Sequence, residues 1–238
     1  IAHFHYAASR GGEVIPQIIG PDYQGCLMCD GHSAYQQSRL PNGFLGACLI
    51  HVMRKFKELV KIGKGAKALE HSKAAKAVEK LGKVFHTEDG LSYTTAVQKA
   101  QERKRKVKPL LDEFYEFISK IKKPISRLKT AINYALSQKQ RVYQIFDHGE
   151  MPLDNNHDEQ QIRPTTIRRK NYLFTKSEVG AKANAMWYRI IQTAKLNKLR
   201  VREYLEYLLE AFAWTDQPDW KAYLPWAPEI QEGFCITN

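Results

Sequence analysis

Hydrophobic and polar positions follow two different periods along this chain. Residues 25–29 form a short apolar run typical of a buried strand, and the run ends at Asp30-Gly31. Residues 44–50 form a second run of the same kind. From about Arg54 the period becomes helical. The pattern therefore predicts an α/β segment followed by a largely helical one.

Five later segments have apolar residues at helical spacing. The first two also have lysine-rich opposite faces, as amphipathic helices do. The stripes are Ala77, Val78, Leu81, Val84 and Phe85; Leu110, Phe114, Phe117, Ile118 and Ile121; Leu128, Ile132, Ala135 and Leu136; Trp187, Ile190, Ile191 and Ala194; and Val201, Tyr204, Leu205, Leu208, Leu209 and Phe212. We expect residues 216–226, with two prolines and two tryptophans, to be an extended segment held by its aromatic side chains.

This order of elements suggests a helical insertion within an α/β domain. Two short strands cannot form a sheet that covers so many helices. We therefore expect the domain to have further strands upstream of Ile1.

Charge changes this picture because it is unevenly distributed. The 238 residues contain 37 Lys+Arg and 25 Asp+Glu, a net charge of +12, which favours a polyanionic partner. Residues 54–83 carry ten basic and three acidic groups, 99–129 eleven and four, and 160–202 eleven and one, whereas 203–238 carry one and seven. The basic blocks either bind phosphates or are solvated helix faces.

No segment approaches the ~20 apolar residues that cross a bilayer, and the chain start lacks the order of a signal peptide. Four cysteines are too few for a disulfide scaffold in a chain of 238 residues. We expect a soluble intracellular protein with reduced thiols, no membrane partner and a buried core.

Two cysteine motifs have the residue types of a zinc site. They are Cys26-x-x-Cys29 and Cys48-x-x-His51. Residues three apart on a strand face opposite sides of the sheet, so Cys26 and Cys29 reach one ion only if the strand bends. We therefore do not expect zinc.

Two acidic positions are candidates for chemistry. Asp30 follows a strand, where ligands commonly bind in α/β folds, although Asp-Gly is also a common turn pair. In residues 152–159, Asp154 or Asn155 is a good N-cap and Glu159 falls one turn later. That segment is either a capped helix or a source of metal ligands beside phosphate-binding arginines.

Five motifs follow one another along nearly the whole chain: CDGHSAY from Cys29, CLIHVMRKF from Cys48, DNNHDE from Asp154, IRPTTIRRKNYLF from Ile162 and LPW from Leu224. In this order they resemble the IS66 family of bacterial insertion-sequence transposases. The resemblance implies a DDE transposase with a ribonuclease-H-like sheet, in which two aspartates and one glutamate hold two divalent metal ions, Mg²⁺ or Mn²⁺.

Carried onto this sequence, the resemblance assigns the second aspartate to Asp30 and the glutamate to Glu159. The first aspartate would precede Ile1. The implied fold is a partial ribonuclease-H-like α/β fold: residues 1–56 are the first part of the catalytic core, 57–148 a helical insertion, 149–200 the second part of the core, and 201–238 a C-terminal helix and aromatic tail. Two positions depart from the family pattern, Gln160 for arginine and Leu49 for tryptophan.

Further residues gain roles from the resemblance. It places His51 near the acids, where the ring either orients a carboxylate or phosphate or is a buried histidine bonded to backbone; Asn155 is a second candidate beside the ligands. The residues expected to hold DNA phosphates are Arg163, Arg168, Arg169 and Lys170, with Arg54 and Lys55 as weaker candidates. Tyr172 and Phe174 either stack on bases or pack internally.

The resemblance implies metal-dependent phosphodiester hydrolysis and strand transfer at insertion-sequence ends, with transposon and target DNA as partners. A homo-oligomer, accessory insertion-sequence proteins and a place at the bacterial nucleoid in the cytoplasm are further expectations. Because the first aspartate would lie upstream, we expect this chain alone to be inactive. A non-catalytic DNA-binding or assembly fragment is the alternative.

Overall fold

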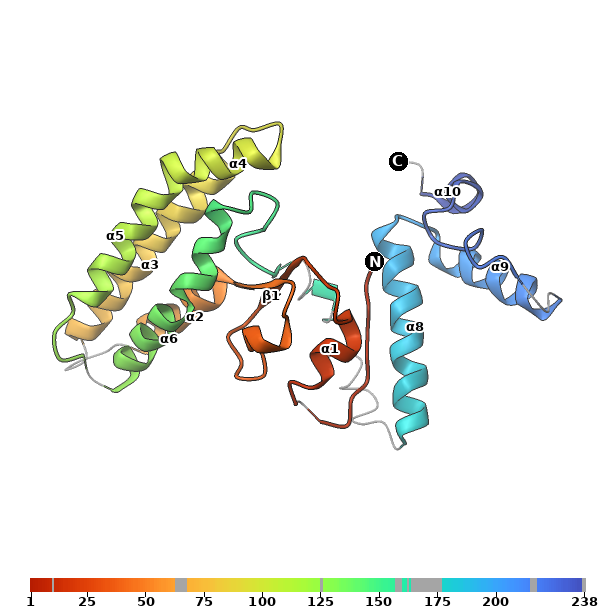
Figure 1. Cartoon of the computed structure of the whole chain (residues 1–238), viewed down its shortest axis with the longest axis horizontal. Coiled ribbons are helices and arrows are strands. Elements are labelled where there is room, and N and C mark those ends of the chain that lie inside the picture. Colours follow the sequence, from red (N-terminus) through yellow and green to blue (C-terminus); the bar gives the residue numbers. More distant parts are fainter. Residues whose placement is uncertain are drawn as a thin grey trace. The chain divides into compact units, whose positions relative to one another are not determined.

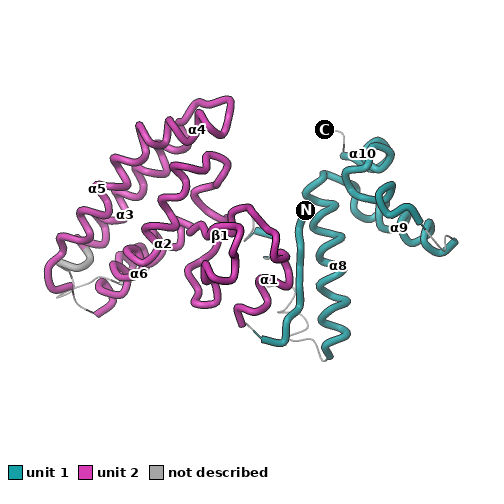
Figure 2. Tube along the Cα trace, viewed as in Figure 1, with its two compact units in different colours: residues 1–9, 157–238 teal, residues 10–156 magenta. Residues whose placement is uncertain are grey.

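The computed structural model describes residues 1–9, 11–62, 68–124, 126–156, 160–161, 163, 177–214 and 218–236 (Figure 1). The chain divides into two compact units (Figure 2). The larger unit contains residues 10–156, and the smaller contains residues 1–9 together with 157–238. None of the helices in the described part is both long and apolar enough to cross a membrane.

The larger unit contains a two-stranded parallel sheet. Strand β1 (Cys26–Cys29) pairs with β2 (Phe44–Ala47), and Cys29 lies opposite Ala47. The connection includes a 3₁₀ turn, η1 (Gln37–Arg39). Both predicted strands are present, but the second ends at Ala47 because α2 (Leu49–Ile62) begins two residues later. Helix α2 starts there because Leu49, Val52, Met53 and Phe56 form an apolar stripe, all of it buried.

Helices make up most of the rest of this unit. They are α1 (Val14–Ile19), α3 (Ala68–Asp89), α4 (Ala96–Glu102), the π-helical turn η3 (Arg103–Val107), α5 (Lys108–Ser119), α6 (Ser126–Tyr143) and the 3₁₀ turn η4 (Gln144–Phe146). The chain is thus mostly helical with a small sheet, which agrees with the α/β expectation. Figure 1 shows α3 and α5 side by side, where they pack on each other.

The predicted apolar stripes of α3, α5 and α6 belong to one core. Leu81 of α3, Phe114 of α5 and Leu128 of α6 are all almost fully buried. Phe56 of α2 meets Phe114 edge-on, with ring centroids 5.9 Å apart. Four stripe positions are wrong. Leu136 is 40% exposed, because the buried face of α6 continues through Gln138 instead, and the predicted stripe residues Trp187, Leu209 and Phe212 of the smaller unit are also exposed.

A buried arginine joins three parts of this unit. Arg103, in η3, is fully buried. Its Nε donates to both Glu88 carboxylate oxygens at 3.0 Å, and its Nη1 donates to the Met151 carbonyl at 2.8 Å. Nη1 also lies within bonding distance of the Ile145 and Gly149 carbonyls. The guanidinium therefore ties the end of α3 to the segment that leads into Asp154.

The described part of the smaller unit includes the helices α8 (Glu178–Leu196), α9 (Val201–Ala213) and α10 (Pro228–Phe234). The N-terminal residues lie along α8, where the Ala2 N–H donates to Thr193 Oγ1 at 3.0 Å. Arg189 also donates to the Phe4 carbonyl at 3.1 Å. The helices of residues 187–194 and 201–212 are thus present as predicted.

The expectation of an extended tail at residues 216–226 is wrong for the residues described. Turns and bends run from Trp220 to Ala227, and α10 follows with Pro228 at its start. Asp219 Oδ1 accepts the Lys221 N–H at 3.1 Å, and this side-chain bond favours a turn over a strand. Aromatic contacts do hold the segment, since Phe212 lies 5.1 Å from Trp220 between ring centroids.

Replacing Arg103 tests the importance of the buried ion pair. Arg103→Met leaves Glu88, which is only 12% exposed, with one partner fewer and removes a donor from several carbonyls. Breaking such a pair from one side costs about 3 kcal/mol of unfolding free energy. Urea unfolding followed by circular dichroism measures the loss. The control is Lys104→Met, whose exposed pair with Asp147 contributes under about 1 kcal/mol. Equal losses in the two variants would contradict the assignment.

Candidate catalytic site

Three segments of the larger unit meet at the carboxyl edge of its sheet. Parallel strands place their carboxyl ends together, so Asp30 after β1 and Cys48 after β2 share this edge. The Cys48 N–H donates to the Cys29 carbonyl at 3.2 Å, and the Leu49 N–H donates to the Leu153 carbonyl at 2.9 Å. The Asn155 backbone amide also faces the Cys48 thiol and opposes the rise that burial causes in the pKa of that thiol. The residues that follow β1, β2 and Leu153 are therefore neighbours.

Asp30 is half-buried and begins a tight turn. Its Oδ1 accepts the His32 N–H at 3.1 Å, and Gly31 adopts a left-handed conformation with φ of +63°. The turn that Asp-Gly predicts is thus present. It uses one carboxylate oxygen, and no bond to Oδ2 occurs in the part of the chain that the structure describes. The turn and a ligand role are therefore compatible.

Basic side chains of α2 lie beside this edge. Arg54 and Lys55 are both exposed, and Arg54 Nη1 lies 3.3 Å from His51 Nε2. The Lys55 ammonium is 5.5 Å from the centre of the Tyr134 ring. The Tyr134 hydroxyl in turn donates to the Asp30 carbonyl at 3.4 Å. The edge therefore combines a carboxylate with two cations within reach of solvent.

Asp154 and Asn155 begin the next helical segment. Asp154 Oδ1 accepts the Asn156 N–H at 2.9 Å, which agrees with the predicted capping role. Asn156, Gln160, Gln161 and Arg163 are helical. Asn155 Oδ1 is buried, and among the described residues it has no hydrogen-bond partner. A buried acceptor without a donor is costly and marks a position that a cation or an unseen donor would satisfy.

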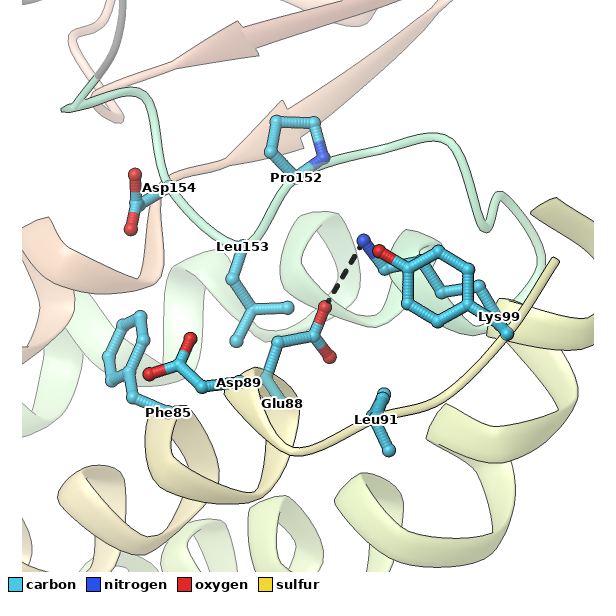
Figure 3. Close-up of a pocket in the computed structure, with 9 residues that line it drawn as sticks. Phe85, Glu88, Asp89, Leu91, Lys99, Pro152, Leu153 and Asp154 are labelled. Atoms are coloured by element: carbon cyan, nitrogen blue, oxygen red, sulfur yellow. Dashed lines mark ion pairs between the residues drawn. The ribbon is translucent and has the colours of Figure 1, made fainter. Parts of the chain in front are cut away.

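A surface pocket of about 370 Å³ borders Asp154 (Figure 3). Glu88 lies in it and pairs with Lys99 at 3.5 Å, in addition to its pair with Arg103. The Lys99 ammonium also lies 4.7 Å from the centre of the Tyr93 ring. Lys99 and Arg103 balance the negative charge of Glu88. Because Arg103 also donates to the Met151 carbonyl, these contacts stabilise the segment before Asp154.

The thiols at this sheet are core side chains. Burial raises the pKa of Cys26 to about 11, and burial also raises the pKa values of Cys29 and Cys48. All three are therefore protonated near neutral pH in the metal-free chain. Across the described ranges, no group of three or more His, Cys, Asp or Glu side chains is arranged to hold a metal ion.

The structure thus places Asp30, Asn155 and helix α2, which carries His51, Arg54 and Lys55, at one edge of the sheet through the contacts given above. Arg163 is exposed and belongs to the other unit. The remaining predicted residues lie outside the described residues: Glu159, Arg168, Arg169, Lys170, Tyr172 and Phe174.

One face of α6 that the sequence pattern did not single out also contacts this edge. Tyr134, Gln138 and Arg141 all touch the segment from Cys29 to Tyr35. Burial and the negative charge of Asp30 raise the pKa of Tyr134 to about 12, so its hydroxyl remains a donor. Their spacing of four and three residues was a signal, because polar residues at that spacing share a helix face.

Comparison with known proteins gives the family of this chain. A model of the Transposase IS66 family matches residues 1–183. Two relatives from Sinorhizobium fredii (strain NBRC 101917 / NGR234), uncharacterized proteins y4qI and y4hP, are 28% and 29% identical over 94% of this chain. The chain spans 42% and 43% of their lengths. No solved structure matches the chain. With more than half of its residues matched by the family model, the chain belongs to the IS66 family of transposases.

Proposed function

We propose that this chain carries part of a DNA transposase catalytic centre, with Asp30 and Glu159 as ligands of divalent metal ions. The observation that carries the proposal is the carboxyl edge of the sheet, where Asp30 follows β1 and where Tyr134, bonded to the Asp30 carbonyl, also contacts the Lys55 ammonium. Parallel strands with a carboxylate at this edge are compatible with a ribonuclease-H-like core. The same proposal includes the domain boundaries expected from the sequence: a catalytic core of residues 1–56 and 149–200, a helical insertion of residues 57–148, and a C-terminal part of residues 201–238.

The oxygen donors at this edge fit Mg²⁺ or Mn²⁺. Asp30 supplies a carboxylate, the kind of hard oxygen ligand that these ions prefer. Beside the ligands, Asn155 has a buried amide oxygen that lacks a donor within the described residues. When bound, the ions would lower the pKa of an attacking water or hydroxyl and stabilise the leaving oxygen of a phosphodiester. Glu159 would complete the set from the segment that Asp154 caps.

The chain's own side chains have separate tasks in this proposal. Asp30 and Glu159 hold ions and do not act as general bases. Arg54 and Lys55 hold DNA phosphates beside Asp30, and Arg163, Arg168, Arg169 and Lys170 hold phosphates after Glu159. His51, in contact with Arg54, orients that guanidinium.

Metal titration tests the two carboxylates. Asp30→Asn and Glu159→Gln should each weaken Mn²⁺ binding by about tenfold or more, because even residues behind the ligands contribute that much to metal affinity. Electron paramagnetic resonance of free Mn²⁺ during titration measures the affinity. Asp22→Asn is the matched control, since Asp22 is an exposed acid of the same unit. If both variants bind Mn²⁺ as tightly as the parent chain, the catalytic proposal fails and the non-catalytic alternative replaces it.

Salt dependence tests the basic run after Glu159. Each phosphate contact contributes about −0.9 to the slope of log affinity for duplex DNA against log salt concentration. Replacing Arg168, Arg169 and Lys170 together by alanine should therefore flatten the slope by about 2.7. Fluorescence anisotropy at several salt concentrations measures it.

The control for the salt experiment is Arg168→Lys combined with Arg169→Lys, which keeps all three charges and should leave the slope nearly unchanged. An alanine triple variant with the parent slope would assign this run to packing or solubility.

A further inference from the structure

Helix α6 contacts the turn that contains Asp30 at several points. The Tyr134 hydroxyl donates to the Asp30 carbonyl at 3.4 Å, and Arg141 Nη2 donates to the Tyr35 carbonyl at 2.9 Å. Arg141 Nη1 also lies 3.8 Å from the Cys29 sulfur. Gln138 lies between these two residues on the same helix face. One face of α6 therefore contacts the chain before, at and after Asp30.

Gly31 shows how closely this face approaches. A Cβ atom at Gly31 would lie 2.9 Å from the amide carbon and nitrogen of Gln138, and 3.0 Å from the Tyr134 ring. Gly31 also has the left-handed φ of +63°, which disfavours residues with a Cβ. The Asp30-Gly31 turn thus packs directly on the Gln138 amide.

Gln138 is buried in a way that packing alone does not explain. The residue is only 6% exposed, and its Nε2 donates to Ser137 Oγ at 3.1 Å. Its Oε1 is buried and accepts no hydrogen bond from the residues described. An unsatisfied buried acceptor is unfavourable, whereas methionine, with a side chain of similar length, has no such group. Gln138 Oε1 therefore either accepts a hydrogen bond from a water molecule or destabilises the folded state.

We propose that Gln138 is a positioning residue for Asp30, holding the Asp30-Gly31 turn through its amide while Oε1 accepts a hydrogen bond from a water molecule at the same edge. Resting on the proposed function, this makes the helical insertion part of the metal site. Gln138 acts through Asp30 and does not bind the ion. Buried polar groups that orient ligands are commonly worth a factor of about 10 to 100 in metal affinity.

Gln138→Met is the informative variant because stability and metal binding should respond differently. Its urea unfolding midpoint should equal or exceed that of the parent chain, because methionine has a similar length and needs no water held beside it in the core. Its Mn²⁺ affinity should fall about tenfold. Gln140→Met is the matched control, since Gln140 is exposed on the same helix and should change neither quantity.

A double-mutant cycle with Asp30→Asn tests whether Gln138 acts through Asp30. In the Asp30→Asn background, Gln138→Met should weaken Mn²⁺ binding no further. In the absence of metal, the two substitutions should also be coupled in the unfolding equilibrium by at least about twofold, as expected for contacting groups. A Gln138→Met chain with parent Mn²⁺ affinity and no coupling to Asp30 would overturn the proposal.

The two measurements separate this proposal from the proposed function. Coupling in the metal-free unfolding cycle without Asp30-dependent Mn²⁺ binding would reject the function and retain the contact between α6 and Asp30. If Mn²⁺ binding depends on Asp30 but Gln138→Met leaves it unchanged, the proposed function is retained and the positioning role of Gln138 is rejected. If Gln138→Met fails to fold, Gln138→Leu replaces it in both cycles, because it also removes the amide that packs against the Asp30-Gly31 turn. An absence of coupling there would also overturn the proposal.

Discussion

A two-stranded parallel sheet cannot bury its own faces, and this constraint governs the larger unit. Strands β1 and β2 have four residues each, so few backbone bonds hold them together. Helices supply the missing contacts: Ala47 of β2 belongs to the core formed by α2, α3, α5 and α6. The position of Asp30 at the end of β1 therefore depends on helix packing more than on strand pairing.

The buried Arg103 shows the same dependence in the second half of the site. A cation taken out of water is costly unless its donors are used, and Arg103 uses them on Glu88 and on backbone carbonyls between Ile145 and Met151. Its place in a π-helical turn is consistent with this, because such turns often occur where a helix serves a specific local contact. The segment before Asp154 is thus held from the helical side of the unit.

The sequence predicted those features that depend on neighbouring residues. Apolar spacing located both strands and the stripes of α3, α5, α6, α8 and α9, and Asp-Gly identified the turn at Asp30. Features that depend on distant contacts were missed. Gln138 looks like a solvent-facing residue in its helix, and it is buried only because a turn far earlier in the chain packs against it. The prediction of an extended tail was wrong because a side-chain hydrogen bond of Asp219 stabilises a turn in place of an extended backbone.

These distant contacts change how the long spacing between the proposed ligands is understood. Glu159 lies 129 positions after Asp30. A segment that served only as a spacer would need only to bring the chain back to the site. The helices between them do more, because Tyr134 contacts Asp30 from 104 positions away and Arg141 contacts Cys29 from 112. A shift of α6 would therefore move the Asp30 turn directly, since Gly31 leaves no free space between them. A helical insertion taken from another transposase would preserve the geometry at Asp30 only if it presented a matching face at these positions.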